Sequence, residues 1–261
     1  MKRFAKLCKS KAFRDEVGSV VLASSTLMRE CFGRGSEKTI AKTLFVADWA
    51  RVPEGISAKR VMRANAAVMK KCAGVLNADG LDCVGEFEAP RIMDYGEFVK
   101  NAKRARGVGG VRVLALEGVQ DPGNLGTLTR TAVAFGWDVV ALLPGTCDPF
   151  NDKAMRAARG ATFRVDFVAF DSFDALVRAG KEINMELFAA EPSEGNVRDD
   201  PERAATVESV CLVLGTEGQG LSEEALRACK PVTIPMSGEM ESLNVGIAGS
   251  ILMYLMQRKK R

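Results

Sequence analysis

Polar side chains that could take part in catalysis gather in three short stretches, each between a predicted strand and a predicted helix. The first carries Asn124 and Arg130, the second carries Glu217 among glycines, and the third carries Ser242 and Asn244. In sheets built from repeated β-α units, such loops lie at the carboxyl ends of the parallel strands. We therefore expect the three stretches to converge on one site at that edge of a sheet.

The first stretch leads from Asp121-Pro-Gly into an apolar helix over residues 125–135. Asn124 lies near the helix start, where asparagine is a good N-cap. Arg130 follows about one and a half turns later, and its side chain could point back toward the same edge of the sheet. A cap followed by an ordinary surface arginine explains the stretch as well, so on its own it indicates no reaction.

The second stretch, residues 215–220, has the glycine order G-x-x-G-x-G and no following G-K-[ST]. It therefore matches neither the dinucleotide fingerprint nor the phosphate-binding loop of nucleoside triphosphatases. Its glycines still permit close approach of the backbone to a ligand. Glu217 at the apex suits a ribose hydroxyl or a cationic group better than a phosphate. A tight turn with an exposed glutamate is the alternative.

The third stretch, residues 235–245, is a loop of small and polar residues that opens with a proline. Ser242 and Asn244 flank Leu243 at the entry to a predicted helix, residues 243–256, that is apolar on nearly every face. Alternatively, Ser242 is only the N-cap of that helix and Asn244 an early-turn residue. That alternative does not explain why a loop of small and polar residues precedes them.

The composition excludes several kinds of chemistry. The chain has no histidine, which removes Ser-His-Asp and Cys-His catalysis, histidine-ligated metals and a histidine general base. Its seven cysteines are scattered and form no C-x-x-C pair, which argues against a disulfide framework and a cysteine-rich zinc site. We expect no metal. Any reaction must use carboxylates, Lys, Arg, Tyr, hydroxyls, thiols, backbone amides or a reactive cofactor.

Charge is distributed unevenly along the chain. Residues 1–90 carry 16 Lys and Arg against 10 Asp and Glu, whereas residues 91–261 carry 21 against 23. A basic first part suggests contact with a polyanion such as nucleic acid, although an ordinary solvated surface explains the charge equally well. No apolar run reaches the ~18 residues needed to span a bilayer. We expect an intracellular protein, cytoplasmic by default, with plastid and mitochondrion also compatible.

Alternating strands and helices predict an α/β protein with two domains. The expected domains are residues 1–90 and 108–261, with residues 91–107 as a basic, glycine-ending linker in which residues 91–105 could form a helix. The second domain should hold a parallel sheet covered on both faces. Predicted helices span residues 4–14, 24–31, 57–69, 125–135, 149–159, 172–181, 222–228 and 243–256. Predicted strands span residues 17–23, 42–47, 84–87, 111–116, 138–143, 163–170, 185–190, 210–214 and 232–234.

Together the three stretches carry a recognisable set of motifs. They read D-P-G-N-L-G-T-L-x-R-T-A from Asp121, L-G-T-E-G-x-G-L from Leu214, and I-P-M-x-G-x-x-x-S-L-N-V from Ile234. In order and spacing this set resembles the three signature motifs of the SpoU (TrmH) family of RNA ribose 2′-O-methyltransferases. The resemblance covers residues 111–256. Less specifically, residues 1–90 are similar to the family's small α/β substrate-binding domain, a fold shared with some ribosomal proteins.

The resemblance implies a fold, a cofactor and a partner subunit. The fold would be that of the SPOUT superfamily, in which the last part of the chain threads a loop to form a deep trefoil knot. Such a knot departs from the usual rules of chain connection. The cofactor would be S-adenosyl-L-methionine, and a homodimer would form through the apolar last helices. Cofactor contacts are expected from the residues in and around the knot: Leu214, Gly215, Gly218, Ile234, Met236 and Leu243.

The resemblance also assigns roles within the site. Arg130 would engage the ribose 2′-hydroxyl, and because guanidinium stays protonated we favour stabilisation of the developing alkoxide and a contact to the adjacent phosphate. Asn124 would orient Arg130 or the ribose, Glu217 would support the loop or Arg130, and Ser242 and Asn244 would complete the hydrogen bonding. One departure concerns residues 156–161, where family members often carry a serine and this chain has none.

The expected function is therefore methylation of a ribose 2′-hydroxyl in structured RNA, with ribosomal RNA favoured over transfer RNA. An RNA-binding homologue that keeps the fold but has lost catalysis is the alternative from a different class. The five polar residues of the three stretches argue against it. A nucleotide-dependent oxidoreductase lacks its fingerprint.

Overall fold

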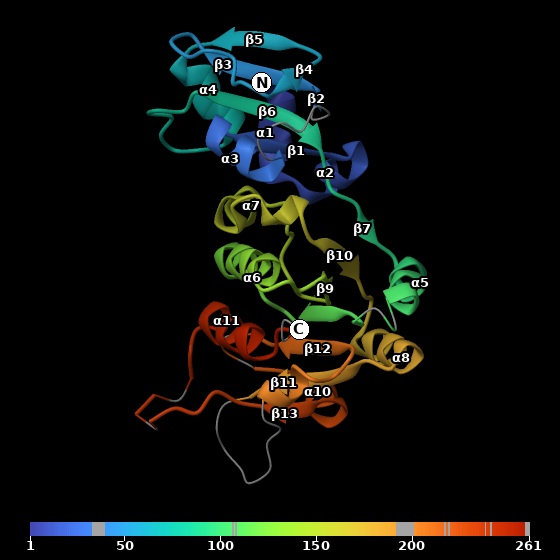
Figure 1. The fold of residues 1–261 in the computed structure, drawn as a ribbon. Helices are drawn as coiled ribbons and strands as arrows, with labels where there is room; N and C mark the ends of the chain where they lie inside the picture. The colour runs from blue at the N-terminus through green and yellow to red at the C-terminus, as the bar shows by residue number, and fades with distance from the viewer. Residues whose placement is uncertain are drawn as a thin grey trace. The chain divides into compact units, whose positions relative to one another are not determined.

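The computed structural model describes residues 1–32, 40–105, 107, 109–191, 201–216, 218, 220–237, 239–240 and 242–258. The chain divides into two compact units, each with its own sheet (Figure 1). Unit 1 consists of Met1–Pro90 and Asp148–Arg164. Unit 2 consists of Arg91–Cys147 and Val165–Arg261.

Unit 1 is built on a four-stranded sheet in the order β1-β6-β3-β5. The strand β6 is antiparallel to both of its neighbours, whereas β3 and β5 are parallel. The sheet strands are β1 (Ser19–Ala23), β3 (Thr43–Ala47), β5 (Val61–Ala64) and β6 (Cys83–Glu88), and β2 (Ile40–Ala41) pairs with β4 (Ser57–Ala58). The helices are α1 (Lys2–Lys9), α2 (Lys11–Val17), α3 (Ser25–Phe32), α4 (Ala66–Ala73), α7 (Asp152–Ala158) and the short 3-10 helix η1 (Ala161–Phe163).

Two predicted helices of this unit were wrong in detail. Residues 4–14 form α1 and α2 rather than one helix, because Ser10 adopts an extended conformation and its hydroxyl caps α2 by accepting from the Phe13 amide. Residues 57–69 hold β4, β5 and only the start of α4, although Val61, Ala64 and Val68 recur at helical spacing. Pairing with β3 outweighs that local pattern.

The segment 148–164 packs within unit 1, although the predicted boundary assigns it to the second domain. Arg14 and Asp148 form a buried ion pair, and Arg159 pairs with Glu30. Gly160 has a φ of 82°, and a Cβ there would overlap the backbone of Glu30. These contacts fix a segment of the middle of the chain to the N-terminal sheet unit.

Unit 2 is built on a seven-stranded sheet in the order β13-β11-β12-β8-β9-β10-β7. Every neighbouring pair is parallel, which confirms the predicted parallel sheet. Its strands are β7 (Ile92–Met93), β8 (Arg112–Leu116), β9 (Val139–Leu142), β10 (Asp166–Ala169), β11 (Glu186–Ala190), β12 (Val210–Leu214) and β13 (Lys230–Val232). Its helices are α5 (Tyr95–Ala105), α6 (Pro122–Ala134), α8 (Phe173–Ile183), α9 (Pro201–Ala204), α10 (Glu223–Ala228) and α11 (Val245–Leu255).

Three boundaries differ from the predicted ones. Residues 91–107, expected as a linker with a helix at residues 91–105, carry β7 at the sheet edge and then α5, which begins only at Tyr95 and packs on α8. The predicted strand over residues 163–170 begins only at Asp166, after η1. The strand expected over residues 232–234 ends at Val232.

None of the helices in the described part of the chain has the length and apolar character needed to cross a membrane.

Helices cover both faces of the unit 2 sheet (Figure 1). On one face, buried side chains of α5 and α8 such as Phe98 and Leu176 pack on strand residues that include Val113. On the other face lie α6 and α11, which are in close contact with each other. A Cβ added to Gly249 of α11 would lie 2.5 Å from both Leu128 Cδ2 and Leu214 Cδ1, so this glycine allows α11 to approach α6 and β12.

Candidate active site

The first two stretches begin side by side at the carboxyl edge of the sheet. Leu116, the last residue of β8, is aligned with Leu214, the last residue of β12. The Glu117 amide then donates a hydrogen bond of 2.9 Å to the Leu214 carbonyl. The loops after β8 and β12 therefore start as neighbours, as the β-α pattern predicts.

The first stretch enters α6 through a cap formed by Asp121. Its carboxylate accepts from the Asn124 amide at 2.9 Å, and Pro122 occupies the first helical position. The capping residue is thus Asp121 rather than Asn124, and the Asn124 side chain serves another contact.

That contact joins the first and third stretches. The Asn244 Nδ2 donates to Asn124 Oδ1 at 3.3 Å, across 120 residues of sequence. Asn244 is also the N-cap of α11, since its Oδ1 accepts from the amides of Gly246 at 2.9 Å and Ile247 at 3.3 Å. A Cβ at Gly246 would approach Asn124 Oδ1 to 3.2 Å, so glycine keeps the space between the two asparagines open. Deeper along the helices, the hydroxyls of Thr131 and Ser250 lie 3.1 Å apart.

The second stretch closes into a tight loop. The Thr216 amide donates to the Gly220 carbonyl at 3.0 Å, and the Gly220 amide donates to the Thr216 carbonyl at 3.1 Å. Gly220 has a φ of 69°, and a Cβ on Gly215 would overlap the Gly220 backbone. Glycine at positions 215 and 220 thus leaves the backbone there uncovered by a side chain. Glu217, expected to support this loop, lies outside the described residues, and Gly218 at its apex is exposed.

Glu117 ties this loop to the first stretch, and the sequence reasoning did not single it out. Its carboxylate accepts from the Ser222 amide at 3.0 Å and from the Ser222 hydroxyl at 2.8 Å. The same hydroxyl caps α10 by accepting from the Ala225 amide. The sequence does contain a signal for Glu117: it is a carboxylate directly after a fully buried strand, and such a residue lies at the edge of the sheet.

Arg130 lies on the exposed side of α6. Six residues separate it from Asn124, which corresponds to about 9 Å along the axis and a rotation of about 120° away from it. In the described part of the chain the guanidinium makes no hydrogen bond or ion pair, so all five of its donors are available to a ligand. The structure therefore brings Asn124 to Asn244, but it does not bring Asn124 into contact with Arg130.

The expected cofactor contacts surround the ends of β12 and β13. Leu214 is buried, and Gly215, Ile234 and Met236 are half-buried. Leu243 keeps 38% of its surface exposed although it is apolar. Ser242 beside it is exposed as well. The edge thus combines partly exposed apolar side chains with glycine backbone.

Two buried cysteines of unit 2, Cys211 and Cys229, provide no nucleophile. Burial raises the pKa of the Cys229 thiol to about 12, and the nearby carboxylates of Glu117 and Glu191 add to the effect. Burial also raises the pKa of Cys211 on β12 well above its ordinary value. Both thiols are therefore protonated at neutral pH and lack the reactive thiolate form. Among the described residues, no cluster of His, Cys, Asp and Glu could hold a metal ion.

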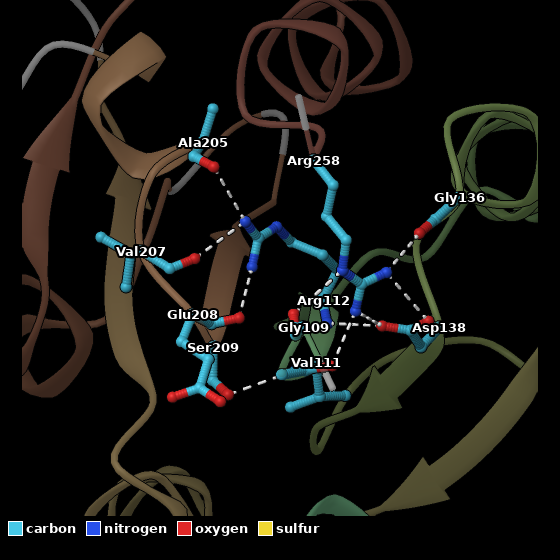
Figure 2. A network of polar contacts seen from close by, with 11 residues as sticks. Gly109, Val111, Arg112, Gly136, Asp138, Ala205, Val207, Glu208, Ser209 and Arg258 are labelled. Carbon is cyan, nitrogen blue, oxygen red and sulfur yellow. Dashed lines mark hydrogen bonds and ion pairs between the residues drawn. The ribbon is translucent and has the colours of Figure 1, made fainter. Parts of the chain in front are cut away.

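At the opposite, amino edge of the sheet, two arginines anchor the chain on either side of β8 (Figure 2). Arg112 is 2% exposed, and its guanidinium donates to the carbonyls of Ala205, Val207 and Glu208. The pKa of Arg112 is lowered to about 10, chiefly by burial and in part by the nearby charge of Arg258, while the Asp138 carboxylate opposes the shift.

Arg258, just after α11, forms the second anchor in this network. It pairs with Asp138 at 2.7 Å and donates to the carbonyls of Gly109, Gly110 and Gly136. The helix α11 is consequently fixed at both ends, by Asn244 at the carboxyl edge and by Arg258 at the amino edge.

Comparison with known proteins places this geometry in a family. The sequence pattern of the SpoU rRNA Methylase family matches residues 112–254. The chain is 31% identical over 216 residues to the 23S rRNA (guanosine(2553)-2′-O)-methyltransferase RlmP of Bacillus subtilis, covering 82% of this chain and 80% of that protein. It is 34% identical over 197 residues to an uncharacterized tRNA/rRNA methyltransferase of Mycobacterium tuberculosis, covering 74% of this chain and 64% of that protein.

Solved structures agree in fold. An rRNA methyltransferase from Sinorhizobium meliloti with bound AdoMet has a TM-score of 0.74 and 25% identity, over 98% of this chain and 92% of that chain. The SpoU methyltransferase AviRb from Streptomyces viridochromogenes, in complex with AdoMet, has a TM-score of 0.78 over 98% of this chain and 95% of that chain. Its 17% identity makes this a likeness of fold alone. The family pattern and the Bacillus relative together show that this chain belongs to the SpoU rRNA methylase family.

Proposed function

We propose that this protein is an S-adenosyl-L-methionine-dependent enzyme that methylates a ribose 2′-hydroxyl in ribosomal RNA. The observation that carries the proposal is the hydrogen bond between Asn244 and Asn124, which joins two of the three family motifs across 120 residues. The Bacillus relative is named for 2′-O-methylation of ribosomal RNA, which favours this substrate class over transfer RNA. The particular guanosine in its name belongs to that protein. An intracellular, by default cytoplasmic, location goes with this substrate.

The residues at the carboxyl edge fit S-adenosyl-L-methionine. At Gly215 a side chain would overlap the Gly220 backbone, so only backbone faces the loop there. Exposed backbone amides and carbonyls suit the polar groups of the cofactor, and partly exposed Ile234, Met236 and Leu243 suit an adenine ring. We assign cofactor binding to these residues together with Leu214, Gly215 and Gly218. When bound, the cofactor supplies an electrophilic methyl group on a sulfonium centre.

The chain must then position a ribose hydroxyl and stabilise its developing charge. Arg130 stays protonated, so in this proposal it donates hydrogen bonds to the 2′-oxygen and to the adjacent phosphate instead of removing a proton. Its exposure and free donors support this role. Asn124, held by Asn244, orients the ribose, and Ser242 adds a hydroxyl at the same edge. Glu217 is assigned to support of the cofactor loop.

The chain path around α11 supports the knot expected for the superfamily. Residues 233–244 lead from the edge strand β13 to α11, which packs on α6 and on β11 and β12 in the middle of the sheet. The Trp137 indole donates to the Met253 carbonyl, so residues after α6 hold the far part of α11. We propose that this passage is the trefoil knot, and that unit 1, with the surplus of basic residues in 1–90, binds the RNA.

We also propose a homodimer through α11. Ile247, Ile251 and Tyr254 follow one another at spacings of four and three residues and so share one face of the helix. Ile247 is 55% exposed and Tyr254 is 57% exposed, which is unusual for an apolar helix face in a monomer. The family resemblance implies that this face packs against the same face of α11 in a second copy of the chain.

Calorimetry and RNA mapping test the function. Calorimetric titration with S-adenosyl-L-methionine should show binding, and mapping of 2′-O-methyl groups should find a ribosomal RNA position that is unmodified in cells lacking the protein. Cofactor binding without a lost modification in any RNA would contradict the proposed reaction. Absence of cofactor binding would favour the inactive RNA-binding homologue.

A further inference from the structure

Unit 1 exposes a tryptophan at the end of β3. Trp49 lies in the turn after Ala47 and is 69% exposed, although tryptophan is usually well buried. Next to β3 runs β5, an edge strand of the sheet, whose Val61 and Met62 are also exposed. The Asp48 amide donates to the Ala64 carbonyl at 3.2 Å, so the turn with Trp49 continues directly from the aligned ends of these two strands.

Arg63 of β5 is fixed against this turn. Its Nη1 donates to the Ala47 carbonyl at 3.1 Å and to the Ala50 carbonyl, the two carbonyls that flank residues 48–49. Arg63 is exposed, and the remaining N–H donors of its guanidinium have no partner among the residues described. A guanidinium held by two carbonyls therefore keeps donors free beside the turn that carries an exposed tryptophan.

The neighbouring charges are mostly positive and unpaired. Residues 48–63 contain Arg51, Lys59, Arg60 and Arg63 against Asp48 and Glu54, a surplus of two positive charges. Arg51 and Arg60 are exposed, and neither forms an ion pair within the described part of the chain. Cations on the same turn as an exposed aromatic residue suit a ligand with both a flat ring and a phosphate. An unpaired nucleotide has both groups.

We propose that Trp49, Arg51 and Arg63 form a nucleotide-stacking surface that binds an unpaired base of the RNA substrate. The base stacks on the indole, and the two guanidinium groups bind the flanking phosphates. This inference rests on the proposed function, because it names the single-stranded feature that unit 1 recognises in that RNA. A protein partner that pairs with the edge of β5 is the competing occupant.

The test uses the full chain and two RNA probes, a hairpin with an unpaired loop and a fully paired duplex of the same base composition. Trp49→Ala should weaken hairpin binding about tenfold to a hundredfold, the range that loss of one stacked base gives, and should change duplex binding less than twofold. Ile40→Ala is the matched control, since Ile40 is 50% exposed in the same unit but precedes the other end of β3. Trp49→Phe should restore most of the hairpin affinity.

Fluorescence adds a readout that a structural role would not change. The chain has two tryptophans, and Trp137 is buried in unit 2. Hairpin RNA should quench the emission of the wild type by stacking on Trp49, and Trp49→Ala should abolish this quenching. Equal hairpin affinity of Trp49→Ala and wild type would overturn the inference, as would an equal loss of duplex binding. A change in self-association alone would assign the surface to a protein contact and also overturn it.

Failure of this inference is distinguishable from failure of the proposed function. If the function is correct and the surface is not, Trp49→Ala methylates ribosomal RNA with an unchanged KM. If the function is wrong, wild-type protein transfers no methyl group to ribosomal RNA, whatever the hairpin measurements show.

Discussion

The hydrogen bonds of Asn244 make a prediction with two separable parts. Asn244→Ala removes the cap of α11 and the bond to Asn124, whereas Asn244→Ser keeps a capping hydroxyl but is too short to reach Asn124. Loss of a cap costs about 1 kcal/mol, and loss of a side-chain hydrogen bond costs about 1 kcal/mol. We therefore expect Asn244→Ala to destabilise the protein by about 2 kcal/mol and Asn244→Ser by about half as much.

These free energies correspond to measurable changes in melting temperature. For a chain of this size, 1 kcal/mol lowers the Tm by roughly 2–4 °C, so the alanine variant should melt about 4–8 °C below wild type. Emission from Trp137 follows the transition, because its indole donates to the Met253 carbonyl of α11. Both variants should lose about tenfold to a hundredfold in kcat/KM, since a small misplacement in an active site has an effect of that order.

Two results would refute this reasoning. A serine variant with wild-type kcat/KM would show that the bond between Asn244 and Asn124 is not needed for the reaction. An alanine variant with wild-type Tm would show that Asn244 is not the cap that holds the start of α11.

Four further substitutions test other parts of the site. Arg130→Ala should abolish methyl transfer and leave calorimetric binding of S-adenosyl-L-methionine within about twofold, since the guanidinium acts on RNA. Ile247→Glu should convert a dimer into a monomer in sedimentation, because it places a charge on the apolar face of α11. Gly249→Val should lower stability by about 1–3 kcal/mol through overpacking against Leu128 and Leu214. The free energy of unfolding should fall above about pH 8.5, because Cys229 ionises there in the unfolded chain but stays protonated in the folded chain, where its pKa is about 12. The Cys229→Ala variant should show a smaller fall.

Each of these expectations has a contrary outcome. Methyl transfer by Arg130→Ala at the wild-type rate would remove Arg130 from the mechanism, and Arg130→Lys serves as the control that keeps the charge. A wild-type protein that sediments as a monomer would contradict the dimer. Unchanged stability of Gly249→Val would mean that α11 can move away from β12. An identical alkaline fall in wild type and Cys229→Ala would show that other groups cause it.

Local signals predicted the elements that position the site, but not the side-chain pairings within it. The buried strands that end at Leu116 and Leu214 are continuous apolar runs, so both were located, and the parallel arrangement followed from the β-α alternation. Asparagine and aspartate are equally good N-caps, so propensity could not choose between Asn124 and Asp121. Only the structure shows that Asp121 caps α6 and that Asn124 bonds to Asn244.

Other features were missed because long-range contacts determine them. Residues 57–69 satisfy a helical pattern, yet pairing of β5 with β3 makes part of them a strand. Residues 148–164 pack with unit 1 through contacts such as Arg14 with Asp148, which are 134 residues apart. Glu117 belongs to no motif that was considered, and its contact with Ser222 spans 105 residues. Periodicity and composition report neighbours in sequence and cannot reveal such pairs.

The attachment of α11 at both ends sets the order in which the protein can become active during synthesis. Asn244 contacts Asn124 across 120 residues, and Arg258 contacts Gly109 across 149 residues. Contacts at such separation form late, since the intervening chain must first be ordered. The strands and α6 can assemble as they leave the ribosome, but the junction of Asn124 and Asn244 cannot form until residues 244–258 have been made. A nascent chain therefore has the sheet before it has the complete site.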